Sequence, residues 1–422
     1  MLSFALSGAD RTNISLAAPL MTKDAIGLTA LGLGVLSSAF FWTYAPMQIP
    51  GGLIGQFISP KKILIVCAVC WGGATFLTSY ADSFGWLIAA RVLLGLAEGA
   101  TFPTYIYLMS RWFPRSERGR ATSLLYFAGY GGGLGAGPLT GWLISSFGWR
   151  PMFRIEGLAT IVIVLAFIFC VSDSPAKSRG LSETERSWIT GQLAAEKAVA
   201  DELKARTGAP KVRWYDLIRI PKLWAGALIY GAPGFAAYGA TYFLPTIIKE
   251  LSGINIGAWI GFLSSVPLGI GMVLVAVNGR VSDHFRRRLP FCVPHVIIGC
   301  VLLICAAVAS GTWLKIGLLF AALGLLYSSV APAYAFGIDS TPVEYRGLAA
   351  GFINVFYQAS GAIAPIALGA VIGTGKAVSG LWILGIIPIA MITIAVVTLA
   401  VSRTMNEMQA VQPVEVEVPA AG

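Results

Sequence analysis

Long apolar runs alternate with short polar loops over most of this chain. Twelve of the runs reach about 20 residues, the length that an α-helix needs to cross the hydrocarbon core of a bilayer. The pattern therefore predicts an all-α polytopic membrane protein with twelve transmembrane helices. The predicted spans are 1–20, 30–54, 61–81, 84–108, 119–146, 152–172, 222–248, 257–278, 289–310, 313–336, 347–373 and 379–401.

One long polar stretch separates the first six spans from the last six. Within it, the segment from Leu181 to Arg206 has the mixed charge of a surface helix. Ser182 is the predicted N-cap of this helix, and Glu185 closes a capping box with it. A solvated linker is favoured over a regulatory site. The expected domains are a six-helix bundle at 1–172, a cytoplasmic linker at 173–221, a second bundle at 222–402 and a disordered cytoplasmic tail at 403–422.

Lysine and arginine are distributed unequally between the two sides of the predicted membrane. Most of the 30 fall in loops that follow even-numbered spans or in the tail. Because basic residues collect on the cytoplasmic side, both termini are expected in the cytoplasm, in a protein of the cell (inner or plasma) membrane. The net charge of +10 is thus explained by membrane topology, and nucleic acid is not an expected partner.

The two halves of the chain share a motif in corresponding loops. Pro114, Arg118, Gly119 and Ala121 recur with the same spacing as Pro342, Arg346, Gly347 and Ala349, and the same offset relates Gly51 to Gly279, Gly55 to Asp283 and Gly133 to Gly361. Two homologous six-helix halves related by a pseudo-twofold axis place a substrate site between them, near mid-depth.

The composition argues against an enzyme. Charged residues make up 12% of the chain, which leaves little sequence for a soluble domain. Cys67 and Cys70 have the spacing of a redox motif, but all six cysteines fall in apolar runs and are interpreted as inert. With His284 and His295 as the only histidines, no metal centre is expected. No cofactor is expected either.

Arg91 and Glu98 are charged residues within a predicted span, with no other charge between Asp82 and Arg111. They are seven residues apart, so they lie on one helix face, roughly 10 Å apart along the axis. A charge at membrane depth is costly unless it faces a cavity or a partner. This face therefore predicts a polar pathway through the protein.

The first span carries a second pair of charges, Asp10 and Arg11. Neighbouring residues of a helix point about 100° apart, so one side chain could line the pathway while the other meets a neighbouring helix. Alternatively, both lie near a membrane interface. We take Asp10 and Glu98 as the acidic residues at depth. A carboxylate in a low-dielectric cavity takes up a proton more readily than one in water, which suits proton coupling.

Uncharged polar residues mark two further helix faces. Tyr44 and Gln48 are four residues apart in the second span, as are Asn354 and Gln358 in the eleventh. Such side chains suit a hydroxyl-rich ligand, although a helix-packing stripe is an equal alternative for the first pair. The glycines of the span at 119–146 predict close helix approach.

Five segments in order resemble the anion:cation symporter family of the major facilitator superfamily, whose members include bacterial hexuronate and aldonate transporters and animal sialic-acid transporters. The segments are DRTNISLAAP at 10–19, FWTYAPMQIPGG at 41–52, LGLAEGATFP at 94–103, RWFPRSERGRA at 111–121 and GWRPMFRIEG at 148–157. The resemblance covers nearly the whole chain. It implies the major facilitator fold, with two pseudo-symmetric six-helix halves, and transport of organic anions with protons.

The resemblance also implies roles for individual residues. Asp10 and Glu98 match the protonatable pair, and Arg91 looks like the family arginine that interacts with these acids. Arg11 would meet the substrate carboxylate through charge-assisted hydrogen bonds. Tyr44 and Asn354 would contact the hydroxyls of the substrate.

A cytoplasmic gate motif is the second implied feature. Asp283 with Arg280 and Arg287 resembles its second-half copy, and Arg118 and Arg346 occupy the repeated loop motif. The sequence departs from the family in two places. Gly55 and Gln56 stand where the first-half gate usually has an acid, and Gly129 and Tyr130 stand near the position of a glutamine found in several sugar-acid carriers.

We therefore expect a monomeric secondary transporter that moves a small organic anion inward with protons by alternating access. A sugar acid such as a hexuronate, aldonate or aldarate is the first expected substrate. The expected partners are this anion, protons and membrane lipid. The alternatives are an exchanger or exporter of organic anions or drugs with the same fold, uptake of aromatic carboxylates or short dicarboxylates, and an anion sensor.

Overall fold

The computed structural model describes residues 2–22, 26–170, 172–178, 180–207, 219–285, 287–341, 346–373 and 377–411, and nearly all of these are helical. The helices are α1 (Leu2–Met21), α2 (Ala30–Phe57), α3 (Pro60–Thr78), α4 (Phe84–Gly99), α5 (Thr101–Trp112), α6 (Arg115–Phe147), α7 (Trp149–Cys170), α8 (Glu183–Thr207), α10 (Pro221–Ser252), α11 (Ala258–Phe285), α12 (Leu289–Val308), α13 (Thr312–Asp339), α14 (Arg346–Ile372) and α15 (Leu381–Val411). Each predicted span overlaps one of them, except that α4 and α5 share the fourth span.

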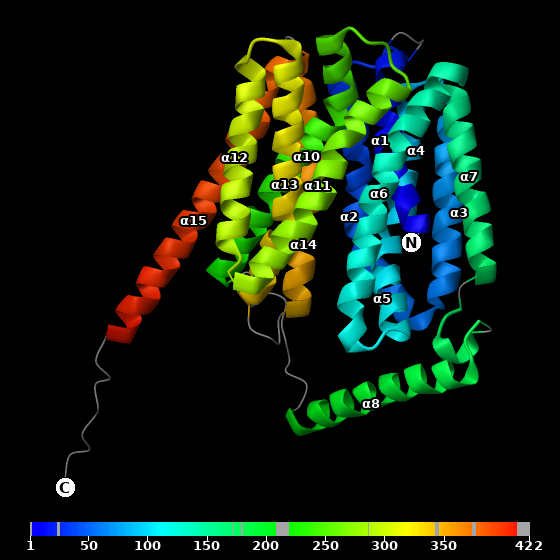
Figure 1. Ribbon diagram of the computed structural model, residues 1–422, viewed down its shortest axis with the longest axis vertical. Coiled ribbons are helices and arrows are strands. Elements are labelled where there is room, and N and C mark those ends of the chain that lie inside the picture. Colours follow the sequence, from blue (N-terminus) through cyan, green and yellow to red (C-terminus); the bar gives the residue numbers. More distant parts are fainter. Residues whose placement is uncertain are drawn as a thin grey trace.

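The helices form two bundles that stand side by side, α1 to α7 in one and α10 to α15 in the other (Figure 1). The predicted architecture of twelve transmembrane helices in two six-helix halves is confirmed. We call the bundle of α1 to α7 the first half and that of α10 to α15 the second half. The helix α8 lies apart from both, across one end of the molecule, and this end is called the α8 end below (Figure 1).

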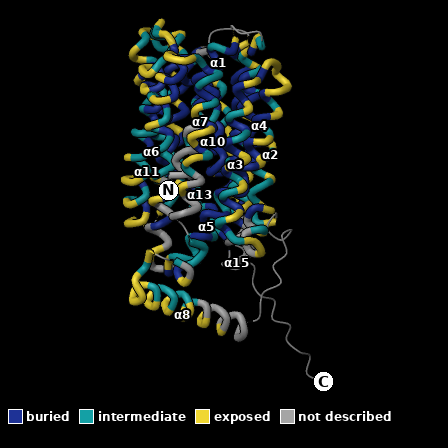
Figure 2. Tube along the Cα trace, turned by 90° about the vertical axis from the view of Figure 1, so that its right-hand side faces the viewer, coloured by how far each residue is buried: buried dark blue, intermediate teal, exposed yellow. Residues whose placement is uncertain are grey.

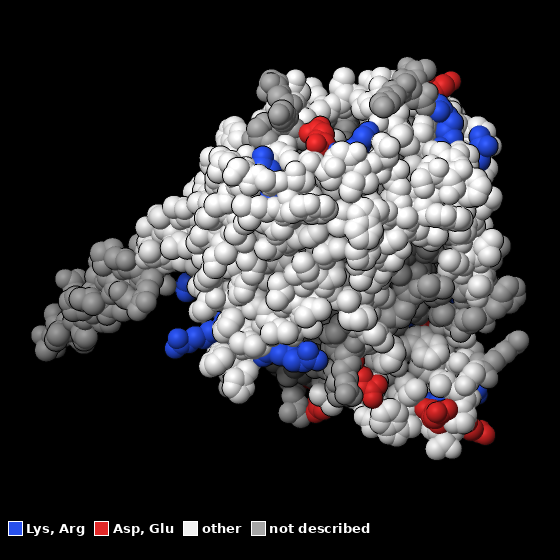
Figure 3. Space-filling model, turned by 45° about the horizontal axis from the view of Figure 1, so that its top comes forward, with Lys and Arg blue, Asp and Glu red and all other residues white. Residues whose placement is uncertain are grey.

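The molecular surface has the character of a membrane protein. Many large apolar side chains are exposed on the helices. The described charged residues gather near the two ends and leave a broad uncharged belt between them (Figure 3). Within the described chain, eight stretches are long and apolar enough on their own to cross a bilayer. The helices outside this set are α1, α6, α7, α8 and α10, and they carry charged residues or are rich in glycine and tyrosine.

The fourth span is interrupted near its centre, which the sequence analysis did not predict. The helix α4 ends at Gly99 and α5 begins at Thr101. Pro103 has no backbone N–H to donate to the carbonyl of Gly99, so the hydrogen-bond ladder is broken at this point. The Thr101 hydroxyl donates instead to the Glu98 carbonyl at 2.6 Å. The break lies directly after Glu98.

The two halves meet most extensively through the helix pairs α2–α14 and α6–α11, and α1 also packs on α10. These pairs are equivalent under the six-helix repeat, because the second span corresponds to the eighth and the fifth to the eleventh. Glycine allows backbones to touch here. A Cβ atom on Gly34 would lie 2.3 Å from the Pro365 carbonyl oxygen, and one on Gly141 would lie 2.3 Å from that of Gly257. Both contacts lie toward the end opposite α8.

Part of the predicted close approach along α6 is confirmed. A Cβ atom on Gly137 would lie 2.5 Å from the Gly261 carbonyl oxygen, and one on Gly133 would lie 2.9 Å from Leu268. Gly131 and Gly135, in contrast, have no neighbouring atom within 4 Å of a built Cβ. Close packing therefore uses only one face of the glycine-rich helix.

The polar linker begins as the sequence predicts. The Ser182 N–H donates to Glu185 Oε2 at 3.0 Å, and the Glu185 N–H donates to Ser182 Oγ at 3.3 Å, which confirms the capping box. These bonds lower the pKa of Glu185 and keep it ionised at the N-terminus of α8. Most of α8 is exposed, whereas buried residues run through the centre of both bundles (Figure 2). Residues 208–218 of the linker and 412–422 of the tail lie outside the described residues.

Candidate functional site

Polar side chains from five helices of the first half converge on one buried cluster. On α1, Asp10 and Asn13 lie one turn apart, and both are almost fully buried. Asp10 Oδ1 accepts hydrogen bonds from Asn13 Nδ2 at 2.8 Å and from the Thr75 hydroxyl at 3.0 Å. Asp10 Oδ2 accepts one from the indole N–H of Trp71. The carboxyl group is thus held by donors from α1 and α3.

Arg91 of α4 packs against the same part of α1. Its guanidinium donates to the backbone carbonyl of Asp10 at 3.3 Å and to Asn13 Oδ1 at 3.2 Å. It also interacts electrostatically with Asp10, Glu98 and Glu156. Among the described side chains of the cluster, the Arg91 guanidinium is therefore the positive charge around which the acids lie.

Glu98 occupies the same face of α4 two turns further on, and only 1% of it is exposed. The prediction that Arg91 and Glu98 share a buried face is confirmed by the burial of both residues and their electrostatic interaction. This face is held against α2 by Gly95 and Gly99, where a Cβ would lie 2.1 Å from the Phe40 carbonyl oxygen and 2.7 Å from that of Tyr44, respectively. The close fit of the two helices fixes the height of Glu98.

A third acid belongs to the cluster. Glu156 of α7 accepts a hydrogen bond from Asn13 Nδ2 at 3.2 Å and another from the Thr140 hydroxyl of α6. The expectation that Asp10 and Glu98 are the acids at depth therefore left out one residue, Glu156. Glu156 lies close in the chain to the basic residues Arg150 and Arg154. Its place inside the predicted span 152–172 was the available signal.

Asn13 is the residue that joins these groups. Its side-chain amide donates both to Asp10 and to Glu156, while its oxygen accepts from Arg91. One neutral amide therefore connects two carboxyl groups and a guanidinium. A change of protonation at either acid alters a hydrogen bond that this amide makes.

Of the predicted substrate-binding residues, Gln48 and Asn354 come together across the two halves. Asn354 Nδ2 of α14 donates to Gln48 Oε1 of α2 at 2.6 Å. Gln358, one turn along α14, is buried, and its Oε1 has no hydrogen-bond partner in the described chain. Tyr44 is buried and stacks on Phe40 at 4.9 Å between ring centroids. The Arg11 side chain lies outside the described residues.

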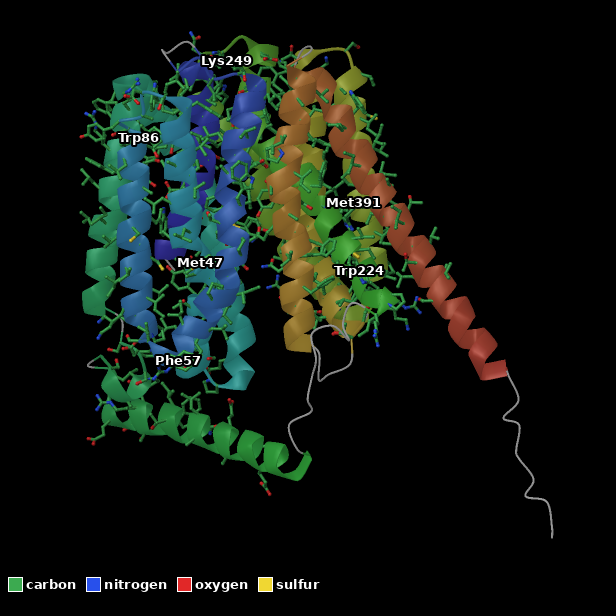
Figure 4. The ribbon with its side chains drawn as sticks, turned by 180° about the vertical axis from the view of Figure 1, so that it is seen from behind. Met47, Phe57, Trp86, Trp224, Lys249 and Met391 are labelled. Atoms are coloured by element: carbon green, nitrogen blue, oxygen red, sulfur yellow. The ribbon has the colours of Figure 1, made fainter. Side chains whose placement is uncertain are left out.

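Labelled side chains in Figure 4 show the depth at which the bond between Gln48 and Asn354 lies. Met47, the neighbour of Gln48, lies near mid-height, between Phe57 toward the α8 end and Lys249 at the opposite end. The Gln48–Asn354 bond therefore belongs to the middle of the interface between the halves. This is the depth at which the sequence repeat predicts the substrate site.

Four tyrosines of the second half form a continuous aromatic surface, which we call the tyrosine wall: Tyr230, Tyr238, Tyr334 and Tyr357. Tyr357 stacks on Tyr230 at 4.7 Å and meets Tyr238 edge-on at 5.3 Å, and Tyr334 lies 5.1 Å from Tyr230. The wall reaches the first half through Tyr238, whose ring lies 4.9 Å from that of Phe41 on α2.

The tyrosine wall leads toward the charged cluster along α10. Tyr230, Gly234, Tyr238 and Tyr242 lie at four-residue intervals on one face of that helix. Tyr242 interacts electrostatically with Arg91. The sequence analysis missed this wall, although the repeated spacing of tyrosines on α10 was a signal for it.

The predicted gate residues of the second half lie at the α8 end of α11. Asp283 accepts a hydrogen bond from Arg288, and this bond raises the pKa of Arg288. Arg288 also lies 3.5 Å from Asp339. The sequence analysis had named Arg280 and Arg287 as the arginines of this motif. Arg280 instead donates to the carbonyl of Ala276 in its own helix at 3.5 Å. The side chains of Arg118 and Arg346 lie outside the described residues.

A twelve-helix fold in two halves, with charged side chains buried between its helices, fits a membrane transporter. The chain belongs to the Major Facilitator Superfamily, whose family model matches residues 1–365. It is 30% identical over 393 residues to a probable galactarate/D-glucarate transporter of Escherichia coli (strain K12), covering 88% of this chain and 85% of that protein. It is 29% identical over 379 residues to a probable sulfoacetate transporter of Cupriavidus necator, covering 87% and 84%.

Solved structures of low sequence identity share the fold. A D-xylose–proton symporter superposes with a TM-score of 0.68 at 15% identity, covering 92% of this chain and 95% of that chain. A bacterial homologue of the human lysosomal transporter Spinster, in an inward-facing and occupied conformation, gives 0.73 at 18% identity, covering 96% and 95%. These likenesses establish the architecture alone.

Proposed function

We propose that the protein is a proton-coupled symporter that takes up a small organic anion, a sugar acid first of all, across the inner membrane. The observation that carries this proposal is the buried cluster in which one amide, that of Asn13, connects Asp10, Glu156 and Arg91. The names of the relatives, which are probable transporters of sugar acids and of sulfoacetate, support an organic anion as the substrate.

The charge balance of the cluster favours coupling to protons. Asp10, Glu98 and Glu156 contribute three carboxyl groups, Arg91 contributes one guanidinium, and we propose Arg11 as the second cation of the site. Without bound protons these groups carry one net negative charge, and an incoming carboxylate adds another. Excess charge is costly in a low-dielectric site. Proton uptake by the acids removes this cost and allows the anion to enter.

The proposed cycle begins with the site open to the outside. Protonation of Glu98 and Asp10 weakens their hold on the arginines, and Arg11 becomes available to the substrate carboxylate. Tyr44, Gln48, Asn354 and Gln358 bind the rest of the substrate from the two halves. The halves then rock about the site, and the lower proton concentration inside releases the protons and the anion.

Packing between the halves supports this cycle. Close backbone contacts between the halves, at Gly34, Gly141 and Gly261, lie toward the end opposite α8. The helix α5, at the α8 end, packs on α2, α3, α4 and α6, all in its own half. Since the distribution of basic residues assigns the α8 end to the cytoplasm, we propose that this arrangement is the inward-facing one, with both termini cytoplasmic.

Uptake of aromatic carboxylates is the second candidate, because the tyrosine wall offers flat rings on which an aromatic acid can stack. In either case the protein works as a monomer with one pathway between its halves. Such a carrier needs no cofactor, because the proton gradient supplies the free energy.

The test is uptake by proteoliposomes under an inward proton gradient, with labelled aldonates, uronates, aldarates and aromatic acids. We expect one class to accumulate against its own gradient, and we expect an ionophore that collapses the proton gradient to abolish this accumulation. Accumulation that survives the ionophore would overturn proton coupling and make anion exchange the leading account. Failure of every acid to enter would overturn organic-anion transport.

A further inference from the structure

Charged residues are confined to one side of the proposed pathway. The buried charges Asp10, Arg91 and Glu98, together with Glu156, belong to the first half. In the second half, the sequence has no lysine, arginine, aspartate or glutamate at 223–248, 251–279, 289–314, 316–338, 347–375 or 377–402. The middle of the second half therefore faces the pathway without any of these four charged residue types.

The tyrosine wall occupies the second half at this depth, and the packing around it fixes the positions of its rings. The Tyr357 ring lies over Gly234, where a Cβ atom would come within 2.7 Å of Cδ2 and 2.9 Å of Cε2. Tyr230 and Tyr238 flank that ring on both sides. A side chain larger than hydrogen at position 234 would therefore displace the ring from the wall. The surface is aromatic with hydroxyl groups at its edges, and it is uncharged.

Gln358 adds a preference for the chemical group that the substrate presents to the second half. It is only 6% exposed, and its amide oxygen has no hydrogen-bond partner in the described part of the chain. It lies one turn from Asn354, which bonds to Gln48 across the halves, so it faces the interface between them. This oxygen can accept a hydrogen bond from a substrate hydroxyl, and the neutral side chain supplies no positive charge to a second carboxylate.

We propose that the substrate carries its negative charge at one end only, so that the protein selects monoacids over the corresponding diacids. This inference rests on the proposed function and narrows it. The carboxylate is bound in the first half, and the uncharged hydroxylated or aromatic body lies against the tyrosine wall and Gln358. A second carboxylate would lose its hydration beside neutral groups, without a cation to replace the water.

The charge balance of the cluster leads to the same selection. With a monoanion bound and Arg11 in its proposed place, two protons neutralise the five ionisable groups of the site and the substrate. A dianion would require a third proton or leave one charge uncompensated. One relative is named as a probable transporter of galactarate and D-glucarate, which are both diacids. The inference therefore comes from the site and not from sequence similarity.

The experiment compares two matched pairs in proteoliposomes under an inward proton gradient: D-gluconate with D-glucarate, and 4-hydroxybenzoate with terephthalate. We expect the monoacid of the transported pair to have a kcat/KM at least tenfold above that of its diacid. Equal or faster transport of the diacid would overturn the inference while leaving organic-anion symport intact. Transport of none of the four acids would overturn the inference as well, and would count against the proposed function itself.

A pair of variants tests the physical cause. Gln358→Lys supplies a cation in the second half, and it should shift the ratio of D-glucarate to D-gluconate transport upward by about tenfold. Gln358→Leu removes the amide without adding charge and should leave glucarate excluded. Asn354→Lys repeats the charge test one turn away if the first variant folds poorly. An unchanged ratio in both lysine variants, with folded protein, would contradict the assignment of the uncharged end to this half.

Discussion

The two halves of the molecule have the same helical architecture but different chemistry at mid-depth. In the first half, Asp10, Arg91, Glu98 and Glu156 are joined in a buried network of charges. In the second half, the corresponding space holds tyrosine rings and the amides of Asn354 and Gln358. An internal repeat therefore preserves the positions of the helices while the site residues on the two copies diverge.

This difference suggests a division of labour. Ionisable groups respond to protons, whereas aromatic rings and neutral amides respond to the shape and hydrogen-bonding groups of a substrate. If the division holds, substitutions in the first half should abolish coupling, and substitutions in the second half should change apparent affinity or selectivity. The following predictions run from the largest expected effect to the smallest.

Replacing the central guanidinium should have the largest effect. Arg91→Gln leaves the acids of the first half without their described buried cation, and breaking a buried ion pair costs about 3–5 kcal/mol. We expect gradient-driven uptake to fall by at least roughly 100-fold. Arg91→Lys should recover little, because one ammonium does not reproduce two separate planar donors to Asp10 and Asn13.

Arg150→Gln is the matched control for this arginine. Arg150 lies over the Trp149 ring, donates to the Ala81 carbonyl at 3.0 Å and stands outside the cluster. Its loss should change uptake by less than about threefold, because Arg150 is half-buried and its bond to the Ala81 carbonyl lies outside the cluster. Equal loss of uptake in the two variants, with both proteins folded, would remove Arg91 from the centre of the account.

Glu156→Gln tests whether the acid missed by the sequence analysis belongs to the coupling site. A glutamine still accepts from Thr140 through its oxygen, but its NH₂ group then faces the NH₂ group of Asn13. Loss of one bond to a charged group costs about 1.5–3 kcal/mol, so we expect roughly a tenfold or larger fall in gradient-driven uptake. Uptake is measured across external pH, and its dependence on pH should become shallower.

The exposed Glu117 on α6 provides the control for this acid. Glu117→Gln should leave both the uptake rate and the pH profile unchanged. A Glu156→Gln protein with the wild-type pH profile would show that Glu156 only fills space between α1 and α7.

Gly234→Ala should disturb the second half without touching the first. Its methyl group would push the Tyr357 ring out of the wall, and overpacking of this kind costs about 1–3 kcal/mol. We expect the KM of the transported acid to rise about tenfold, while the number of protons carried with each anion stays constant. Gly351→Ala is the control, because no atom lies within 4 Å of a Cβ built there. A changed proton ratio in Gly234→Ala would contradict the division of labour.

The smallest effect is expected at the bond between the halves. Gln48→Leu and Asn354→Leu each remove one partner of the 2.6 Å bond, and the double variant removes both. A hydrogen bond of this kind contributes about 0.5–1.5 kcal/mol, so KM should change by about threefold in each single variant. In a double-mutant cycle the effects should be non-additive. Additive effects would mean that the two residues act independently.

Local features of this fold were predictable from the sequence. The spans follow from apolar length, and the capping box of Ser182 and Glu185 follows from residues three apart. The burial of Arg91 and Glu98 on one face follows from helical periodicity. Each of these depends only on neighbours along the chain, which is why the sequence was sufficient.

Features that depend on distant neighbours were not predictable in the same way. The bond of Glu156 to Asn13 joins residues 143 positions apart, and the stacking of Tyr357 on Tyr230 requires α10 and α14 to be placed first. The choice of Arg288 as the partner of Asp283 depends on the conformation of the short α11–α12 loop. Gln48 and Asn354 were named as site residues, but their mutual bond could be seen only in the assembled fold.

The break in the fourth span lies between these two cases. Pro103 is visible in the sequence, and it removes a hydrogen bond wherever it lies within a helix. Whether the helix bends or ends at such a point depends on its packing, which here includes the close contact of Gly99 with Tyr44. The sequence therefore indicated a weak point but not its outcome.

The measurement that tests the central claim most directly compares two transport modes in Glu98→Gln proteoliposomes, with Glu117→Gln alongside. One mode is accumulation of the transported acid under an inward proton gradient, and the other is counterflow exchange with preloaded acid in the absence of a gradient. The account predicts that Glu98→Gln loses accumulation but retains counterflow, while Glu117→Gln retains both. Accumulation that persists in Glu98→Gln would contradict the claim that the buried acids of the first half couple the anion to the proton.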